Sequence, residues 1–133
     1  MKNILVVTSG IVAMILSTAT FAGPREDLLT QYAAAAKVTS FSAARGQTLH
    51  TQNFSGGKPD TPSCTTCHGK DTRGAGRALT GKTIEPVAVS VTPTRYTDPA
   101  KVEKWFKRNC TEVLGRECTP QEKGDWLTFV IGQ

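Results

Sequence analysis

The residues with the clearest chemical meaning form one short run, Cys64-Thr65-Thr66-Cys67-His68. Two thiols three positions apart, followed at once by an imidazole, match the pattern by which haem c is attached: the thiols add to the vinyl groups and the histidine ligates the iron. A thioredoxin-like pair would need a βαβ context, which the flanking sequence lacks. A zinc site would need further ligands, for which Cys110 and Cys118 are a loose match. The run therefore predicts one covalent haem c held by Cys64, Cys67 and His68.

The second axial position on the iron has no methionine to fill it. The two methionines, Met1 and Met14, both lie in the N-terminal segment, so the domain that follows has no thioether to offer. The remaining candidates are His50, a lysine, an asparagine or glutamine amide, water, or no ligand. His50 would give a bis-histidine electron carrier, although its position near a helix end also suits an exposed surface residue.

One predicted helix bears on this choice. Asp98-Pro99 combines an N-cap with a proline at the first helical position, and we expect the helix to run to about Asn109. Val102, Trp105, Phe106 and Asn109 fall on one face of it. A polar group on a buried stripe needs a partner, which for Asn109 is either the iron or a backbone carbonyl. The three apolar residues are candidate pocket walls, or ordinary packing residues.

The other elements predict an all-α domain wrapped around the haem. Helices are expected from Gly23-Pro24 to Ala36 and from Ser40 or Ser42 to Leu49, and a last one begins at the capping box Thr119-Pro120-Gln121-Glu122. Residues 69–97 contain glycines and prolines that break regular structure, so we expect a long loop there. Within it, residues 87–91 alternate like a strand that has no evident partner.

Residues 1–22 are predicted to be a secretory signal peptide. Lys2 is followed by an apolar run from Ile4 to Leu16 and by small residues before a cleavage site after Ala22. The run is shorter than the roughly 20 residues that span a membrane. We therefore expect residues 23–133 to be a single periplasmic domain that is not embedded in the membrane after cleavage.

The charge of the chain is modest. The formal net charge is +5, without a dense basic run or interleaved aromatic residues, which argues against nucleic-acid binding. Basic residues follow the haem motif, and these could dock an acidic redox partner, pair with haem propionates or lie in a solvated loop; they are Lys70, Arg73, Arg77 and Lys82.

Cys110 and Cys118 are left as an even pair in an oxidising compartment, which favours a disulfide over two free thiols.

Several segments together resemble the sphaeroides haem protein family of class I cytochromes c. They are Cys64-x-x-Cys67-His68, Trp105-Phe106-x-Arg108-Asn109-Cys110, Gly115-Arg116-Glu117-Cys118-Thr119 and Glu122-Lys123-Gly124-Asp125. The resemblance implies that Asn109 ligates the oxidised iron and leaves it on reduction, and that Cys110 and Cys118 form a disulfide. It also implies a dihaem cytochrome c or a membrane cytochrome b as electron donor.

These observations lead to one functional expectation and two alternatives. We expect a cytochrome whose reduced haem binds O₂, NO or CO, with conversion of NO to nitrate as an extension that leaves open whether the protein is an enzyme. The first alternative is a plain electron carrier with His50 or a lysine as sixth ligand. The second is a metal-binding or thiol module without haem.

Overall fold

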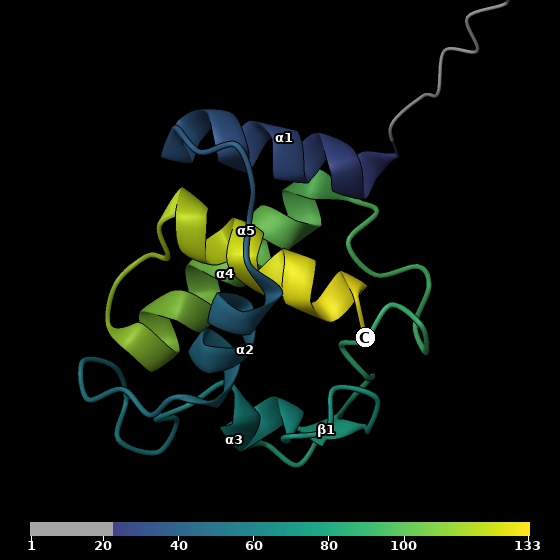
Figure 1. Cartoon of the computed structure of the whole chain (residues 1–133). Helices are drawn as coiled ribbons and strands as arrows, with labels where there is room; N and C mark the ends of the chain where they lie inside the picture. Colours follow the sequence, from purple (N-terminus) through teal and green to yellow (C-terminus); the bar gives the residue numbers. More distant parts are fainter. Residues whose placement is uncertain (1–22) are drawn as a thin grey trace, which may run out of the picture.

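The computed structural model describes residues 23–133, so the predicted signal peptide lies outside the described residues. Five helices and one small hairpin follow in chain order: α1 (Pro24–Ala36), α2 (Ala43–Thr51), α3 (Thr65–His68), β1 (Gly76–Arg77), β2 (Thr83–Ile84), α4 (Pro99–Leu114) and α5 (Pro120–Ile131). In Figure 1, α1 lies at one end of the molecule and α3 with the hairpin at the other, with α2, α4 and α5 between them. No helix among residues 23–133 has both the length and the apolar character needed to cross a membrane.

The predicted starts of the two C-terminal helices are confirmed. The Asp98 side chain accepts a hydrogen bond from the Lys101 N–H at 3.1 Å, ahead of Pro99 at the first helical position of α4. At α5 the Thr119 side chain accepts from the Glu122 N–H while the Glu122 carboxylate accepts from the Thr119 N–H. Both caps satisfy N–H groups that the first helical turn leaves without partners.

One detail of the sequence prediction was wrong, and one pattern in the expected loop did not become a strand. Helix α4 continues past Asn109 to Leu114 and ends at Gly115, whose φ of 74° is the left-handed conformation that terminates helices. Residues 87–91 do not form a strand, because their amides bond to separate segments: the Ala88 N–H donates to the Thr72 carbonyl and the Val89 N–H to the Val130 carbonyl. The hairpin lies earlier, where β1 pairs antiparallel with β2.

The apolar core has two parts. The first is formed mainly by α1, α4 and α5, with Leu28, Leu127 and Val130 almost fully buried. The second lies between α2 and the C-terminal half of α4. Phe106 and Trp126 pack against both parts, with their ring centroids 5.6 Å apart in an edge-to-face arrangement. These two aromatic rings therefore join the two halves of the core.

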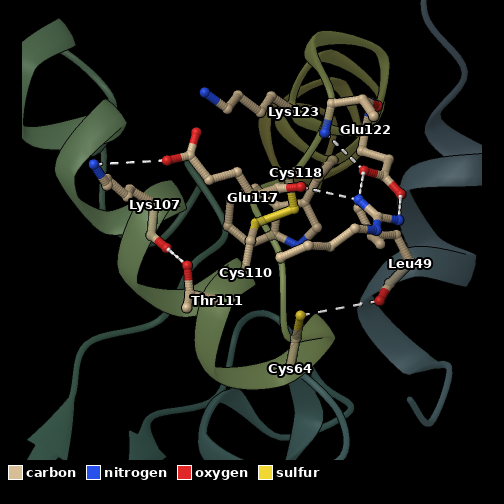
Figure 2. Close-up of a disulfide and its surroundings, with 12 residues drawn as sticks. Leu49, Cys64, Lys107, Cys110, Thr111, Glu117, Cys118, Glu122 and Lys123 are labelled. Atoms are coloured by element: carbon tan, nitrogen blue, oxygen red, sulfur yellow. Dashed lines mark hydrogen bonds and ion pairs between the residues drawn. A yellow bond between two sulfur atoms is a disulfide. The ribbon is translucent and has the colours of Figure 1, made fainter. Parts of the chain in front are cut away.

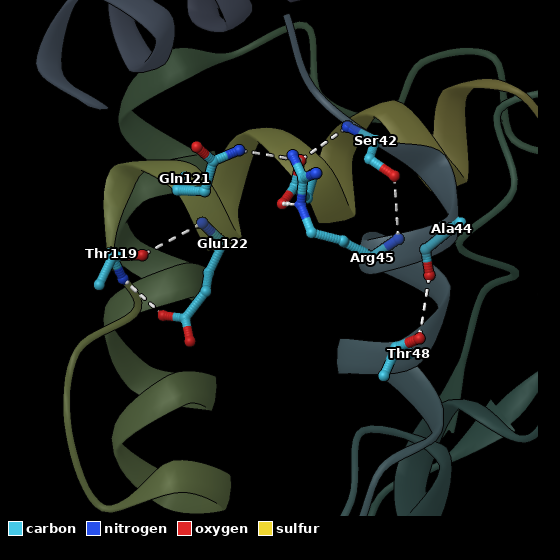
Figure 3. Close-up of polar contacts among 8 residues, drawn as sticks. Ser42, Ala44, Arg45, Thr48, Thr119, Gln121 and Glu122 are labelled. Carbon is cyan, nitrogen blue, oxygen red and sulfur yellow. Dashed lines mark hydrogen bonds and ion pairs between the residues drawn. The ribbon is translucent and has the colours of Figure 1, made fainter. Parts of the chain in front are cut away.

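Helices α2 and α5 cross at very close range. A Cβ atom on Gly46 would lie only 2.1 Å from the Asp125 carbonyl oxygen, so no larger residue fits between the backbones. Figure 3 shows the polar side of this crossing. There the buried Asp125 carboxylate accepts hydrogen bonds from the Ser42 N–H at 2.7 Å, from the Arg45 guanidinium at 2.7 and 2.9 Å, and from the Gln121 amide at 3.1 Å.

Candidate haem-binding site

The Cys-Thr-Thr-Cys-His run folds into a single helical turn. The Ser63 hydroxyl accepts the Thr65 N–H at 3.2 Å at the start of this turn, and the Gly69 N–H donates to the Thr65 carbonyl at 2.9 Å at its end. Residues three apart on a helix lie on the same side, so the turn presents the Cys64 and Cys67 thiols together. His68 follows them directly.

The two thiols are not bonded to each other and are protonated at neutral pH. Both are half-buried free cysteines. Burial raises the pKa of the Cys64 thiol to about 11, and it raises the pKa of Cys67 as well. Redox-active and metal-binding cysteines instead have a lowered pKa, because the thiolate is the reactive form. Within residues 23–133, no group of three or more metal-ligating side chains gathers in one place.

The His68 ring has the properties of a metal ligand. Its Nδ1 atom is buried without a hydrogen-bond partner, the one such side-chain atom among the described residues. Burial, reinforced by His50 and Arg95, lowers the pKa of His68 to about 4, so the ring is neutral at physiological pH. A neutral imidazole has the free lone pair that metal binding requires.

His50 is not exposed, as one interpretation of the sequence had it, but completely buried at 0% exposure. Its ring centroid lies 6.3 Å from that of His68. Both of its nitrogens are in use: Nε2 lies 3.1 Å from the Gly69 carbonyl oxygen, and the Trp126 indole N–H donates to Nδ1 at 3.3 Å. Neither nitrogen therefore has a lone pair to offer to iron.

Helix α4 carries the predicted distal residues on the edge of its buried face. Val102 is buried, Phe106 and Asn109 are half-buried, and Trp105 is 43% exposed. The buried face instead continues through Cys110, Val113 and Leu114. Asn109 is half-buried, and its amide is not among the buried side-chain groups without a hydrogen-bond partner, so it is in contact with solvent. Asn109 and Trp105, one turn apart, thus lie at the partly exposed edge of the helix.

A disulfide follows Asn109 directly. The Sγ atoms of Cys110 and Cys118 are 2.00 Å apart, and the bridge ties the last part of α4 to the segment before α5. Figure 2 shows this bridge together with Cys64, whose thiol lies 3.9 Å from the Leu49 carbonyl oxygen. Leu49 belongs to the same buried cluster as Cys110 and Cys118. The bridge therefore restrains the backbone next to Asn109, and Leu49 lies between it and the first cysteine of the haem motif.

Two large apolar side chains besides Trp105 (43% exposed) lie open on the surface: Leu79 is 56% and Val91 is 49% exposed. These three side chains come from the hairpin turn, the loop after it and α4. The His68 nitrogen without a partner and the two protonated thiols fit a group bonded through sulfur and nitrogen, as haem c is. Lys70, Arg73, Arg77 and Lys82, which follow the motif, are all exposed.

Comparisons with known proteins agree with this geometry. Residues 36–130 match a family model described as a domain of unknown function, DUF1924. The chain is 54% identical over 106 residues to the cytochrome c-type protein SHP of Cereibacter sphaeroides, covering 80% of this chain and 81% of that protein. It is 31% identical over 91 residues to cytochrome c'' of Methylophilus methylotrophus, covering 68% of this chain and 63% of that protein.

Solved structures match as well. Oxidised SHP, described as an oxygen-binding cytochrome c, aligns with a TM-score of 0.79 at 52% identity over 82% of this chain and 96% of its own. A solution structure of the Methylophilus cytochrome c'', concerned with haem-ligand detachment, aligns with a TM-score of 0.68 at 28% identity over 82% and 93%.

The fold and the haem motif together define a class I c-type cytochrome with all-α architecture and one covalently bound haem c. Within this class the chain belongs to the family of SHP, the sphaeroides haem protein. The predicted family, fold class and cofactor are thereby confirmed.

Proposed function

We propose that this cytochrome binds small diatomic gases, O₂, NO or CO, at its reduced haem after Asn109 has left the iron. In this proposal Cys64 and Cys67 hold the haem through thioether bonds, and His68 is the permanent axial ligand. Support comes from SHP, described as an oxygen-binding cytochrome c, and from cytochrome c'', for which ligand detachment has been addressed.

The observation that carries the proposal is the contrast between His50 and Asn109. Both His50 nitrogens are engaged by other protein groups, whereas the half-buried Asn109 amide is open to solvent. The lysine alternative is weak for a related reason. Every lysine of residues 23–133 except Lys123 is exposed, and the Lys123 ammonium lies 2.7 Å from the Glu103 carboxylate.

The chemistry of the amide explains why Asn109 can leave. Haem iron supplies a site whose ligand preferences depend on its redox state, and distal polarity and access then decide what binds there. An amide oxygen is a hard, neutral donor, suited to ferric iron and poorly matched to the softer ferrous iron. Because Asn109 lies on an uncovered edge of α4, its side chain can rotate away without displacing the buried Val102, Cys110 or Val113.

The test compares absorption spectra of the ferric and ferrous holoprotein, with and without CO. The native ferrous protein should be high-spin and bind CO quickly. Asn109→Ala should change the ferric spectrum and leave ferrous CO binding largely intact. Asn53→Ala, the same change at an exposed loop position, should alter neither. A low-spin ferrous spectrum that ignores CO would instead support the plain electron carrier.

We further propose that electrons come from a dihaem cytochrome c or a membrane cytochrome b. The exposed basic residues after the haem motif suit an acidic face on such a donor. Rates of reduction by a purified dihaem cytochrome c should then fall as salt is added, because attraction between exposed charges is screened. A rate independent of salt would argue against this docking surface.

Two finer parts of the proposal have direct assays. NO dioxygenase-like chemistry would combine one NO, one O₂ and one electron into one nitrate, so nitrate should accumulate catalytically when a reductant keeps the haem ferrous.

Periplasmic export with cleavage after Ala22 would give a mature chain that begins at Gly23. Mass spectrometry of the haem-loaded protein purified from the periplasm measures this.

A further inference from the structure

His50 touches both ends of the helical turn that carries the haem motif. At the start of the turn, the Ser63 hydroxyl donates to the His50 backbone carbonyl at 3.1 Å, and the same hydroxyl accepts the Thr65 N–H. At the end of the turn, His50 Nε2 lies 3.1 Å from the Gly69 carbonyl oxygen. One residue of α2 thus makes hydrogen bonds to the residues just before Cys64 and just after His68.

The hydrogen bonds of the ring fix a single tautomer. A carbonyl oxygen can only accept, so Nε2 must carry the proton toward Gly69. An indole N–H can only donate, so Nδ1 must be unprotonated toward Trp126. Both requirements are met by one neutral form of His50, and its 0% exposure leaves no water to substitute for either partner.

The two ends of this connection differ in rigidity. Trp126 packs edge-to-face on Phe106 and Tyr96, with centroids 5.6 and 5.8 Å apart, so it belongs to the packed core. Gly69 has φ 73° and ψ 172°, a backbone conformation that is essentially restricted to glycine. This backbone conformation directly follows His68, and the hydrogen bond from His50 restrains the carbonyl of the residue that adopts it.

We propose that His50 is a positioning residue for His68: it connects the core through Trp126 to the Gly69 carbonyl and so sets the orientation of the axial imidazole. The inference rests on the proposed role of His68 as an iron ligand. It gives His50 a function that requires no bond to iron. Orientation of an axial histidine by its surroundings tunes the metal that it binds.

The test uses His50→Phe, which keeps an aromatic ring and removes both nitrogens, and His50→Gln, whose amide can donate to Gly69. In His50→Phe holoprotein, the reduction potential and the ferric spectrum should shift while the sixth ligand is retained. The Gly69 N–H, which keeps its own bond to the Thr65 carbonyl, should exchange with solvent about fivefold faster, because losing one neutral hydrogen bond to the Gly69 carbonyl makes local opening of the turn easier. His50→Gln should recover a large part of both changes.

Trp126→Phe should shift the reduction potential in the same direction as His50→Phe, but by a smaller amount. The double variant that carries both changes should shift the reduction potential no further than His50→Phe alone. Tyr96→Phe is the matched control, because it removes a hydrogen bond to the Val87 carbonyl beside Trp126 and outside the connection. It should leave the potential unchanged.

The inference is overturned if His50→Phe keeps the native potential, or if Tyr96→Phe shifts it equally. Should His50→Phe fail to fold, ¹⁵N NMR of the native ferrous CO complex still decides: a proton on Nδ1 would refute the proposed connection. Failure of the ligand proposal has a different signature, since His68→Ala would then leave the native haem spectrum in place.

Discussion

Replacing Asp125 by alanine should destabilise the holoprotein by about 2–4 kcal/mol. The carboxylate is 3% exposed and accepts hydrogen bonds from the Ser42 N–H, the Arg45 guanidinium and the Gln121 amide. The Arg45 side chain is 59% exposed, so its ion pair is screened by solvent and contributes at most about 1 kcal/mol. The bond from the half-buried Ser42 N–H to a charged acceptor accounts for most of the rest, about 1.5–3 kcal/mol.

Guanidinium unfolding of the haem-loaded protein, followed by far-ultraviolet circular dichroism and Soret absorbance, measures this loss. Asp125→Asn keeps one acceptor oxygen and should lose about half as much. Glu112→Gln is the matched control, because its pairing with the 64%-exposed Lys58 should be worth less than about 1 kcal/mol. If the free energy of unfolding of Asp125→Ala lies within about 0.5 kcal/mol of the native value, the α2–α5 crossing is held by packing alone.

Three further changes test other parts of the structure. Gly46→Ala should cost about 1–3 kcal/mol by overpacking, measured by thermal unfolding, because its Cβ would meet the Asp125 carbonyl at 2.1 Å; unchanged stability would mean that the helices separate freely. Acidification should lower the free energy of unfolding of the native protein more than that of Asp125→Ala. Burial alone would raise the pKa of Asp125, but its hydrogen bonds lower the pKa overall. The stabilisation by this carboxylate is therefore present above about pH 4 and is lost as pH falls through the lowered pKa. Parallel acid titrations of the two proteins would contradict that. Removing the disulfide with Cys110→Ala and Cys118→Ala should cost about 2–3 kcal/mol for so short a loop, and an unchanged denaturation midpoint would refute it.

The local signals in the sequence were sufficient where neighbouring residues decide the structure. Asp98-Pro99 and Thr119-Pro120 each combine a cap with a proline that suits the first helical turn, and both helices begin there. The end of α4 was predicted too early, at about Asn109 instead of Leu114. Gly115, which adopts the left-handed conformation at the actual end, was the available signal.

The role of His50 could not be predicted from its neighbours in the chain. Its indole partner lies 76 positions away and its carbonyl partner 19 positions away, so only the folded structure brings them to one ring. Residues 87–91 alternate like a strand but lie in the expected loop, since alternation gives a strand only where another strand is available to pair with it. Their amides instead bond to Thr72 and Val130.

The crossing of α2 and α5 also bears on the order in which the molecule assembles. Arg45 and Asp125 are 80 positions apart, so this contact cannot form until nearly the whole chain has been synthesised. Closing so long a loop is entropically costly and slow, and Cys64 and Cys67 lie inside it. The contact between α2 and α5 can therefore form only after both cysteines of the haem motif are present in the chain.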